Sequence, residues 1–334
     1  MLWPLMNEFG LIDKYFARPE RRSRTAGVAL GVGDDCALLA PAPGMQLAVS
    51  SDMLVEGRHF LSTVDPARLG HKALAVNLSD LAACGAKPLG FTLALALPAI
   101  DEPWLAGFSR GLFALADAHG CELVGGDTTR GPLNICITVF GEVPAGTALL
   151  RSGARAGDDI WASGTLGDAR IALEVFRGAL TLPAEAFTLA RARMEQPTPR
   201  VALGQALRGI ASAAVDVSDG LVGDLGHILA ASGVGATLDA DAATQLIAIC
   251  ADGACAAGLF DVEARRSFAL SGGDDYELAF TAPASARVAV EQAARHSVTP
   301  VARIGRIEAE PGLRVVDAGG EPLAQRFGGF DHFA

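Results

Sequence analysis

The sequence has very little lysine and no paired cysteine spacing, and each absence excludes a class of function. Three of the 334 residues are lysine, and 38 acidic side chains outnumber 27 basic ones, which gives a formal net charge of −11. Nucleic-acid binding relies mainly on phosphate neutralisation by a basic surface, so nucleic acid is excluded as a partner. The six cysteines form no CxxC pair and no zinc-ligand spacing. We interpret them as reduced residues of a cytoplasmic protein.

Long apolar runs and the common nucleotide-binding motifs are also missing. No segment approaches the ~20 apolar residues of a membrane span. Residues 1–5 are apolar but too short for a signal peptide, and a start at Met6 would make them an extension. No lysine stands in a glycine-rich loop, and the H-R-D and D-F-G motifs of protein kinases do not occur. If the chain binds phosphates, metal ions, arginines and backbone N–H groups must hold them.

Length and periodicity predict two domains that mix helices and strands. A chain of 334 residues exceeds one ordinary core. The glycine-, proline- and arginine-rich segment 144–157 is the best boundary candidate, so we expect domains at 1–145 and 146–334. Apolar patterns predict helices over 8–16, 66–84, 102–119, 200–210 and 221–231, and a further helix from about residue 168. They predict a buried strand over 46–50 and further strands over 91–97, 122–124, 134–140, 159–163, 213–217 and 276–281.

The most informative feature is a series of acidic residues at predicted strand ends and in tight turns. One such residue means little, because Asp, Ser and Gly are ordinary turn and N-cap residues. Burying many carboxylates without cations is costly, however, and Mg²⁺ prefers carboxylate, hydroxyl and carbonyl oxygens. The pattern therefore predicts a site for several magnesium ions. The acidic motifs are Gly33-Asp34-Asp35, Ser50-Ser51-Asp52, Asn77-Leu78-Ser79-Asp80, Gly125-Gly126-Asp127, Asp216-Val217-Ser218-Asp219 and Ser271-Gly272-Gly273-Asp274-Asp275.

One acidic pair is interpreted differently. Asp158 and Asp159 follow Gly157 and precede a predicted strand. We interpret this pair as a plain surface turn with no part in the site.

The order of these motifs resembles the thiamine-monophosphate kinase family of the aminoimidazole-ribonucleotide synthetase-like ATP-binding superfamily. The resemblance covers nearly the whole chain, and the pair NLSDLAA and GGDTTRG is its most specific part. The resemblance implies a two-domain α+β fold: an N-terminal domain with the metal cluster, which pairs with a second subunit through its sheet, and a C-terminal α/β domain. The matching stretches are GVGDDCALL (31–39), AVSSDMLVEGRHF (48–60), HKALAVNLSDLAACGAKP (71–88), ELVGGDTTRGP (122–132), LLRSGARAGD (149–158), AVDVSDGLVGDLGHI (214–228), SGGDDYEL (271–278) and GGFDHF (328–333).

The resemblance also implies an activity and its residues: ATP- and Mg²⁺-dependent phosphorylation of thiamine monophosphate to thiamine diphosphate by a homodimer. The implied magnesium ligands are Asp35, Ser50, Ser51, Asp52, Asp80, Asp127 and Asp216, with Asp219 holding a further ion. The implied ATP contacts are Gly126, Asp127, Arg151 and Ser218, and the implied substrate contacts are His59, Asp274 and Phe330.

Two positions depart from the family pattern. The family often has Glu where Asp274 stands, so this side chain is one methylene shorter. Relatives commonly carry an aromatic residue near position 119, where this chain has His119. We treat His119 as a candidate nucleotide contact, with a helix C-terminal histidine as the alternative.

The implied chemistry needs neither a nucleophile nor a general base. The acceptor phosphate is already deprotonated, so we expect direct in-line transfer. Cys36 stands beside Asp35, and the nearby carboxylates disfavour a thiolate, so we interpret Cys36 as a packing residue. An acidic Asp274 and an aromatic Phe330 suit the cationic rings of thiamine.

Other functions remain as alternatives. A related synthetase that activates an oxygen with ATP, such as the ring-closing enzyme of purine synthesis, is the nearest one. A selenophosphate synthetase-like enzyme would need a cysteine before Cys36, and a hydrogenase-maturation relative would end in a cysteine-bearing tail; the sequence has neither. An acidic calcium-binding scaffold is disfavoured because no EF-hand loop is present.

Overall fold

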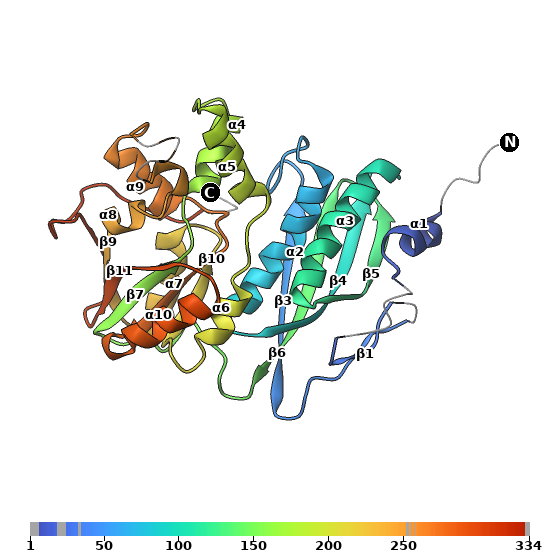
Figure 1. Cartoon of the computed structure of the whole chain (residues 1–334), viewed down its shortest axis with the longest axis horizontal. Coiled ribbons are helices and arrows are strands. Elements are labelled where there is room, and N and C mark those ends of the chain that lie inside the picture. The colour runs from blue at the N-terminus through green and yellow to red at the C-terminus, as the bar shows by residue number, and fades with distance from the viewer. Residues whose placement is uncertain are drawn as a thin grey trace. The chain divides into compact units, whose positions relative to one another are not determined.

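The computed structural model describes residues 7–18, 25–32, 35–251, 254, 256 and 258–330, and the chain divides into two compact units (Figure 1). The first unit comprises residues up to Leu81 together with Ala86–Gly146, and the second comprises Ala82–Gly85 and the chain from Thr147 onward. The expected two-domain mixture of helices and strands is confirmed. On this basis we propose the domain boundaries 1–145 and 146–334. The motif residues Gly33 and Asp34, the possible extension 1–5 and the terminal segment 331–334 lie outside the described residues.

The first unit is built on a four-stranded sheet in the order β3-β6-β4-β5. β6 pairs antiparallel with both β3 and β4, whereas β4 and β5 run parallel. Figure 1 shows the helices α2 and α3 side by side against this sheet. The elements are α1 (Glu8–Tyr15), β1 (Val28–Leu30), β2 (Leu38–Leu39), β3 (Met45–Val55), α2 (Pro66–Ala83), β4 (Lys87–Leu97), α3 (Glu102–His119), β5 (Glu122–Arg130) and β6 (Asn134–Pro144).

Local signals explain why α3 begins and ends where the sequence predicts. Asp101 is its N-cap, and its carboxylate accepts a hydrogen bond from the main-chain N–H of Trp104 at 3.1 Å. Gly120 ends the helix in the left-handed conformation at φ 58°. α2 and α3 approach closely, because a Cβ at Gly111 would lie 1.8 Å from the carbonyl oxygen of Ala67. This contact fixes α2 against α3, and α2 carries the NLSD motif.

All four predicted strands of this unit are longer than expected; 91–97 lies within β4 and 134–140 within β6. The segment 46–50 belongs to the eleven-residue strand β3, and the segment 122–124 belongs to the nine-residue strand β5. The prediction that 46–50 is buried is wrong, because Leu47 and Val49 are 45% and 55% exposed. Met53, further along β3, is 54% exposed. Alternate residues of a strand point to opposite faces, and α2 and α3 cover only one face of this sheet. β3 therefore exposes an apolar row.

The second unit is a six-stranded sheet in the order β12-β9-β11-β7-β10-β8, with helices packed on it. Four of its five strand pairs are antiparallel, and only β12 and β9 run parallel within the described residues. Its elements are β7 (Asp158–Ser163), α4 (Asp168–Phe176), α5 (Ala184–Glu195), α6 (Val201–Ala206), β8 (Ala213–Val217), α7 (Leu221–Ser232), β9 (Gly235–Asp239), α8 (Ala240–Thr244), α9 (Val262–Ser271), β10 (Glu277–Pro283), α10 (Arg287–His296), β11 (Val301–Glu308) and β12 (Gly312–Val316), with 3₁₀ turns at Ala248–Cys250 and Ala284–Ala286.

Apolar side chains of this sheet and its helices form one core. Ile160 of β7, Val215 of β8 and Ile304 of β11 are at most 2% exposed and pack with Leu225 of α7. The predicted helix 200–210 is shorter than expected, since α6 covers only Val201–Ala206. No helix in the described part of the chain combines the length and apolar character that crossing a membrane requires.

The interpretation of Asp158 and Asp159 as a surface turn is wrong. Both residues open β7 and are only 4% and 3% exposed. The Asp158 carboxylate accepts hydrogen bonds from the Arg155 N–H at 2.9 Å and the Ser212 hydroxyl at 2.6 Å. The Asp159 carboxylate accepts two hydrogen bonds from Arg287, at 2.6 and 2.8 Å. Hydrogen-bond and ion-pair partners make the burial of these carboxylates possible, so the pair is structural.

Candidate functional site

Two predicted ligands of the first unit meet where α2 crosses β3. The Ser50 hydroxyl donates to Oδ2 of Asp80 at 2.5 Å. Two residues further along β3, the main-chain N–H of Asp52 donates to Oδ1 of Asn77 at 3.1 Å. Asn77 and Asp80 lie three residues apart on α2, so both face the same strand. The NLSD motif therefore holds β3 in place and also supplies a carboxylate beside a hydroxyl.

Ser51 points away from this pair. Its hydroxyl lies 3.0 Å from Oγ1 of Thr138 and donates to the carbonyl of Ile137 at 3.2 Å. The β3–β6 register places Ser51 directly opposite Thr138, on the sheet face away from α2. The Ser50 and Ser51 side chains therefore do not converge, and Ser51 could join a metal site with Ser50 and Asp80 through its main-chain carbonyl only.

Gly126 and Asp127 lie within β5, not in a loop after it. In the register with β4, Gly126 lies beside Leu93 and Asp127 beside Ala94. Asp127 is exposed. Gly126 has φ 149°, and a Cβ there would lie 1.9 Å from the carbonyl oxygen of Leu93. The backbone itself requires glycine at this position, whatever its part in nucleotide binding. Asp35 is exposed in a bend before β2.

The two candidate histidines of this unit occupy different environments. Nδ1 of His59 accepts a hydrogen bond from the Val55 N–H at 3.0 Å, so the neutral ring carries its proton on Nε2. His119 ends α3 and is partly buried. Burial, and secondarily the nearby His71, lowers the pKa of His119. A neutral imidazole is therefore favoured there, which weakens any role for His119 as a cation at the helix C-terminus.

The loop after β8 carries the candidate ligands of the second unit. Asp216 lies within β8 and is 6% exposed, on the opposite strand face from the core residues Val215 and Val217. Ser218 and Asp219 follow the strand, and both of their main-chain N–H groups donate to Oδ2 of one carboxylate, Asp224, at 3.0 Å.

Asp224 is a residue that sequence reasoning missed. It is 3% exposed in the first turn of α7, and burial raises the pKa of its carboxyl to about 7. Its two hydrogen bonds fix the backbone of the ligand loop. The spacing of five residues from Asp219 inside the SDGLVGD stretch was a usable signal, because a carboxylate in the first turn of a helix binds main-chain N–H groups next to the helix N-terminus.

The predicted substrate contacts Asp274 and Phe330 lie against the same loop. The Asp274 N–H donates to the Ser218 carbonyl at 2.7 Å, and the Phe330 N–H donates to the Asp219 carbonyl at 2.8 Å. Phe330 is 45% exposed, so its ring is accessible to a ligand. Three motifs that are distant in the sequence thus meet around residues 218–219. Arg151, the predicted ATP contact, is exposed in the segment before β7.

The interpretation of Cys36 as a packing residue is wrong, because its side chain is exposed. Among the described residues, Cys36, Cys84, Cys121, Cys136 and Cys250 form no disulfide.

The donor set fits Mg²⁺ in its chemistry. Every predicted ligand offers oxygen, and Ser50 and Asp80 already place a hydroxyl and a carboxylate together. Among the described residues, no group of three or more acidic, histidine or cysteine side chains is close enough to hold a metal ion. The predicted ligands are distributed over both units, so neither unit alone presents the full set.

Comparison with known proteins assigns both units. The model of the AIR synthase related protein N-terminal domain matches residues 33–143, and that of the corresponding C-terminal domain matches residues 155–318. The chain is 49% identical to the thiamine-monophosphate kinase of Salmonella typhimurium over 330 residues, which cover 98% of each chain. It is 46% identical to the enzyme of that name from Escherichia coli over 329 residues, again 98% of each.

Solved structures agree with these relatives. The thiamine-monophosphate kinase of Stenotrophomonas maltophilia K279a superposes with a TM-score of 0.83 at 48% identity and covers 95% of this chain and 98% of its own. A structure of AaThiL complexed with AMPPCP and TMP has a TM-score of 0.73 at 28% identity and covers 100% of this chain and 99% of its own. With both units matched and near-complete coverage at high identity, the chain belongs to the thiamine-monophosphate kinase family.

Proposed function

We propose that this chain transfers the γ-phosphoryl group of ATP to the phosphate of thiamine monophosphate, which gives thiamine diphosphate and ADP. The observation that carries the proposal is 49% identity over 98% of the chain with an enzyme of that activity. The complex of the more distant AaThiL with AMPPCP and TMP supports the same pair of substrates.

The second unit supports this function through the loop 218–219. Ser218 and Asp219 are held by Asp224, while Asp274 and Phe330 lie against the same backbone. The acidic side chain and the exposed ring suit the cationic, aromatic rings of thiamine. The Arg151 guanidinium supplies positive charge for the ATP phosphates, which no lysine motif provides.

The magnesium ligands we propose in the first unit are Asp35, Ser50, Asp52, Asp80 and Asp127, with Ser51 through its carbonyl; Asp216 and Asp219 are those of the second unit. Bound Mg²⁺ would neutralise the two phosphate groups as they approach and stabilise charge on the transferring group. Their mutual repulsion in a low-dielectric site would otherwise amount to several kcal/mol. This need for charge compensation is the physical reason we propose so many acidic residues as magnesium ligands.

We propose a single displacement. An oxygen of the acceptor phosphate forms the new bond to the γ-phosphorus, and the bond from that phosphorus to the β,γ-bridging oxygen breaks, leaving ADP. The acceptor oxygen carries no proton at neutral pH, so no side chain has to remove one.

The experiment that tests this function is incubation with ATP, MgCl₂ and thiamine monophosphate, followed by chromatography of the products. Formation of thiamine diphosphate that stops when EDTA is added is the expected result. Parallel reactions with thiamine and with an aminoimidazole precursor are the controls. Turnover of one of these acceptors, with none of the monophosphate, would favour the related synthetase activity instead.

Cys36→Ser is expected to keep at least about a tenth of kcat, allowing ~1.4 kcal/mol for local changes. The thiol is exposed and free, and an oxyanion acceptor gains little from covalent catalysis. Initial rates at saturating substrates measure this. A chiral γ-phosphate label should emerge inverted. Retention of configuration, or a phospho-enzyme able to phosphorylate the substrate, would show a two-step route.

The chain is expected to be a homodimer that pairs through the sheet of the first unit. Leu47, Val49 and Met53 expose an apolar row on the edge strand β3, and such rows mark association surfaces. Light scattering should give about twice the 34.3 kDa chain mass. Val49→Lys should shift the mass toward the monomer, whereas Val288→Lys, at a 64% exposed site of α10, should not. A monomeric wild type at micromolar concentration would contradict this assembly.

We place the protein in the cytoplasm. The described cysteines form no disulfide, which suits a reducing compartment, where disulfides are rare.

A further inference from the structure

The segment that follows Gly273 alternates between buried and accessible residues. Asp275 and Glu277 are 3% and 0% exposed, whereas Asp274 and Tyr276 are partly exposed. Asp274 and Tyr276 also have positive φ angles, 72° and 52°. Residues other than glycine rarely adopt this conformation, and it persists only where the surroundings hold the backbone. Two such residues within three positions require strong anchoring.

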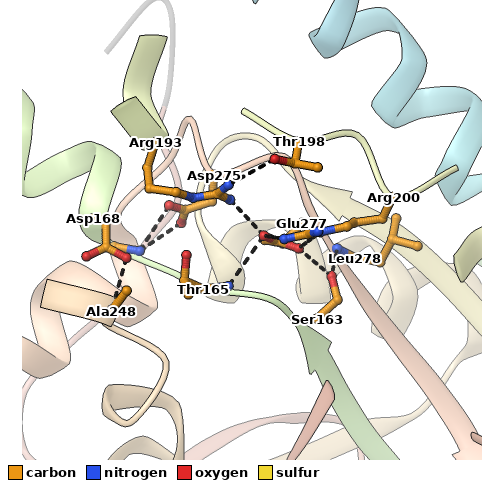
Figure 2. Close-up of polar contacts among 11 residues, drawn as sticks. Ser163, Thr165, Asp168, Arg193, Thr198, Arg200, Ala248, Asp275, Glu277 and Leu278 are labelled. Atoms are coloured by element: carbon orange, nitrogen blue, oxygen red, sulfur yellow. Dashed lines mark hydrogen bonds and ion pairs between the residues drawn. The ribbon is translucent and has the colours of Figure 1, made fainter. Parts of the chain in front are cut away.

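Glu277 provides one anchor, and Figure 2 shows Arg193 and Arg200 reaching its carboxylate. Arg193 donates to Oε1 at 2.7 Å, and Arg200 donates to both oxygens at 2.6 Å. The Ser163 hydroxyl donates to Oε2 at 2.6 Å, and the Thr165 N–H donates to Oε1 at 3.3 Å. This carboxylate is thus fully buried and fully hydrogen-bonded, an arrangement that fixes a side chain in one position.

The backbone around Glu277 is shaped for its carboxylate. A Cβ at Gly164 would lie 2.0 Å from Oε1, and Gly164 has φ 55°. No other residue type fits there without displacing the carboxylate.

Asp275 provides the second anchor, at the connection between β7 and α4. Its two carboxyl oxygens lie 3.0 and 3.1 Å from the Gly167 nitrogen, which donates to them. Burial, above all, raises the pKa of Asp275 well above its usual range, which favours the neutral form of this group. Glu277 is the carboxyl group that contacts both Arg193 and Arg200. On the other side, the Tyr276 N–H donates to the Val217 carbonyl at 2.8 Å.

We propose that Glu277 is a positioning residue for the substrate. Held by Arg193, Arg200 and Ser163, it keeps Asp274 and Tyr276 in their left-handed conformation, so that the Asp274 carboxylate stands where the cationic rings of thiamine monophosphate bind. This inference rests on the proposed function, because it takes Asp274 as a substrate contact. It predicts that weakening the Glu277 cluster impairs binding of the acceptor and leaves binding of ATP little changed.

Another buried carboxylate of the same unit supplies a matched control. Asp159 on β7 is 3% exposed and pairs with Arg287 and Arg303, at 2.6 and 3.4 Å. Its chemistry therefore parallels that of Glu277. Its strand partner on β10 is Ala282, which is far along the strand from Asp274. Asp159→Asn should reduce stability without a selective effect on either substrate.

The first test compares Glu277→Gln with Asp159→Asn in steady-state kinetics. Glu277→Gln is expected to raise KM for thiamine monophosphate about tenfold or more, with KM for ATP within about twofold of wild type, as expected when a binding contact is misplaced. Asp159→Asn should change both constants by less than about twofold. Equal changes in both KM values for Glu277→Gln, matching those of Asp159→Asn, would show a merely structural role.

A milder pair of variants keeps the test valid if Glu277→Gln does not fold. Arg193→Gln removes one of the donors to Glu277 and leaves Arg200 and Ser163 in place. Arg191→Gln is its control, because Arg191 lies on the same helix but pairs with Glu195 at 2.9 Å. Arg193→Gln should raise KM for thiamine monophosphate about threefold or more, and Arg191→Gln should not. The proposal is wrong if the two variants behave alike.

Amide hydrogen exchange separates this inference from the proposed function. In Arg193→Gln, the amides of Asp274 and Tyr276 should exchange faster than in wild type by about tenfold, while the amides of β7 keep their protection. If wild type did not phosphorylate thiamine monophosphate but these amides exchanged faster in Arg193→Gln, the proposed function would be wrong and the anchoring by Glu277 would be supported. If wild type were active but Arg193→Gln changed neither these amides nor KM for thiamine monophosphate, only the anchoring proposal would be wrong.

Discussion

Asp80→Asn and Asp127→Asn are each expected to lower kcat by about 10²-fold or more, because each would remove an anionic oxygen ligand from the magnesium site that we propose. The amide oxygen introduced by Asp80→Asn could still accept the hydrogen bond that Ser50 donates, so the α2–β3 contact should survive. Asp127 is exposed, and its replacement should not disturb the core. Steady-state rates at saturating ATP and thiamine monophosphate, over a range of MgCl₂ concentrations, measure the effect.

Asp158→Asn is the matched control for these variants. Its carboxylate binds Arg155 and Ser212 inside the second unit. We expect it to cost about 1–3 kcal/mol of unfolding free energy, since buried hydrogen bonds are weakened. Its kcat, measured below its unfolding temperature, should stay near wild type. If Asp158→Asn lowered kcat as much as Asp80→Asn, our division of the acidic motifs into site and structure would be wrong.

Gly126→Ala is expected to destabilise the first unit by about 3 kcal/mol or more. The added Cβ would lie 1.9 Å from the carbonyl oxygen of Leu93, and φ is 149°. The clash is between two backbones, so no side-chain rotation relieves it, and β5 would have to separate from β4. Thermal unfolding followed by circular dichroism should show a clearly lowered Tm.

Gly125→Ala is the control, one residue earlier on the same strand. A Cβ there meets only a methyl group of Thr92, at 4.0 Å, which is ordinary van der Waals contact. We expect a change in unfolding free energy of less than about 1 kcal/mol. If Gly126→Ala kept the wild-type Tm and raised only KM for ATP, Gly126 would matter as a ligand contact and not through its backbone.

Local patterns were sufficient to predict several of the helices and the acidic motifs. α3 has the predicted bounds because its N-cap Asp101 and its terminal Gly120 are signals within the helix itself. α2 and β8 were likewise predicted to within a residue. The elements between residues 232 and 270 and after residue 283 were not predicted. Several of them are short, and their apolar residues pack against strands far along the chain.

The motif residues can be identified from the sequence, but the strand pairing decides which of their side chains point toward one another. Ser50 and Ser51 are neighbours with the same chemistry, yet the β3–β6 register places their hydroxyls on opposite faces. In the sequence, Asp158 resembles any acidic turn residue. Its hydrogen-bond partner Ser212 lies 54 positions away, so only the fold brings the two together.

The sequence alone determined this protein's family, its activity class and the residue types of its site. These depend on contiguous motifs, which can be recognised in the sequence without a structure. Only the tertiary structure decided which carboxylates are buried and which distant side chains bind them. Glu277 shows the reason: its partner Ser163 is 114 residues away, and its partner Arg193 is 84 residues away. A buried charge is tolerated only where such distant donors meet it, and no local pattern records that meeting.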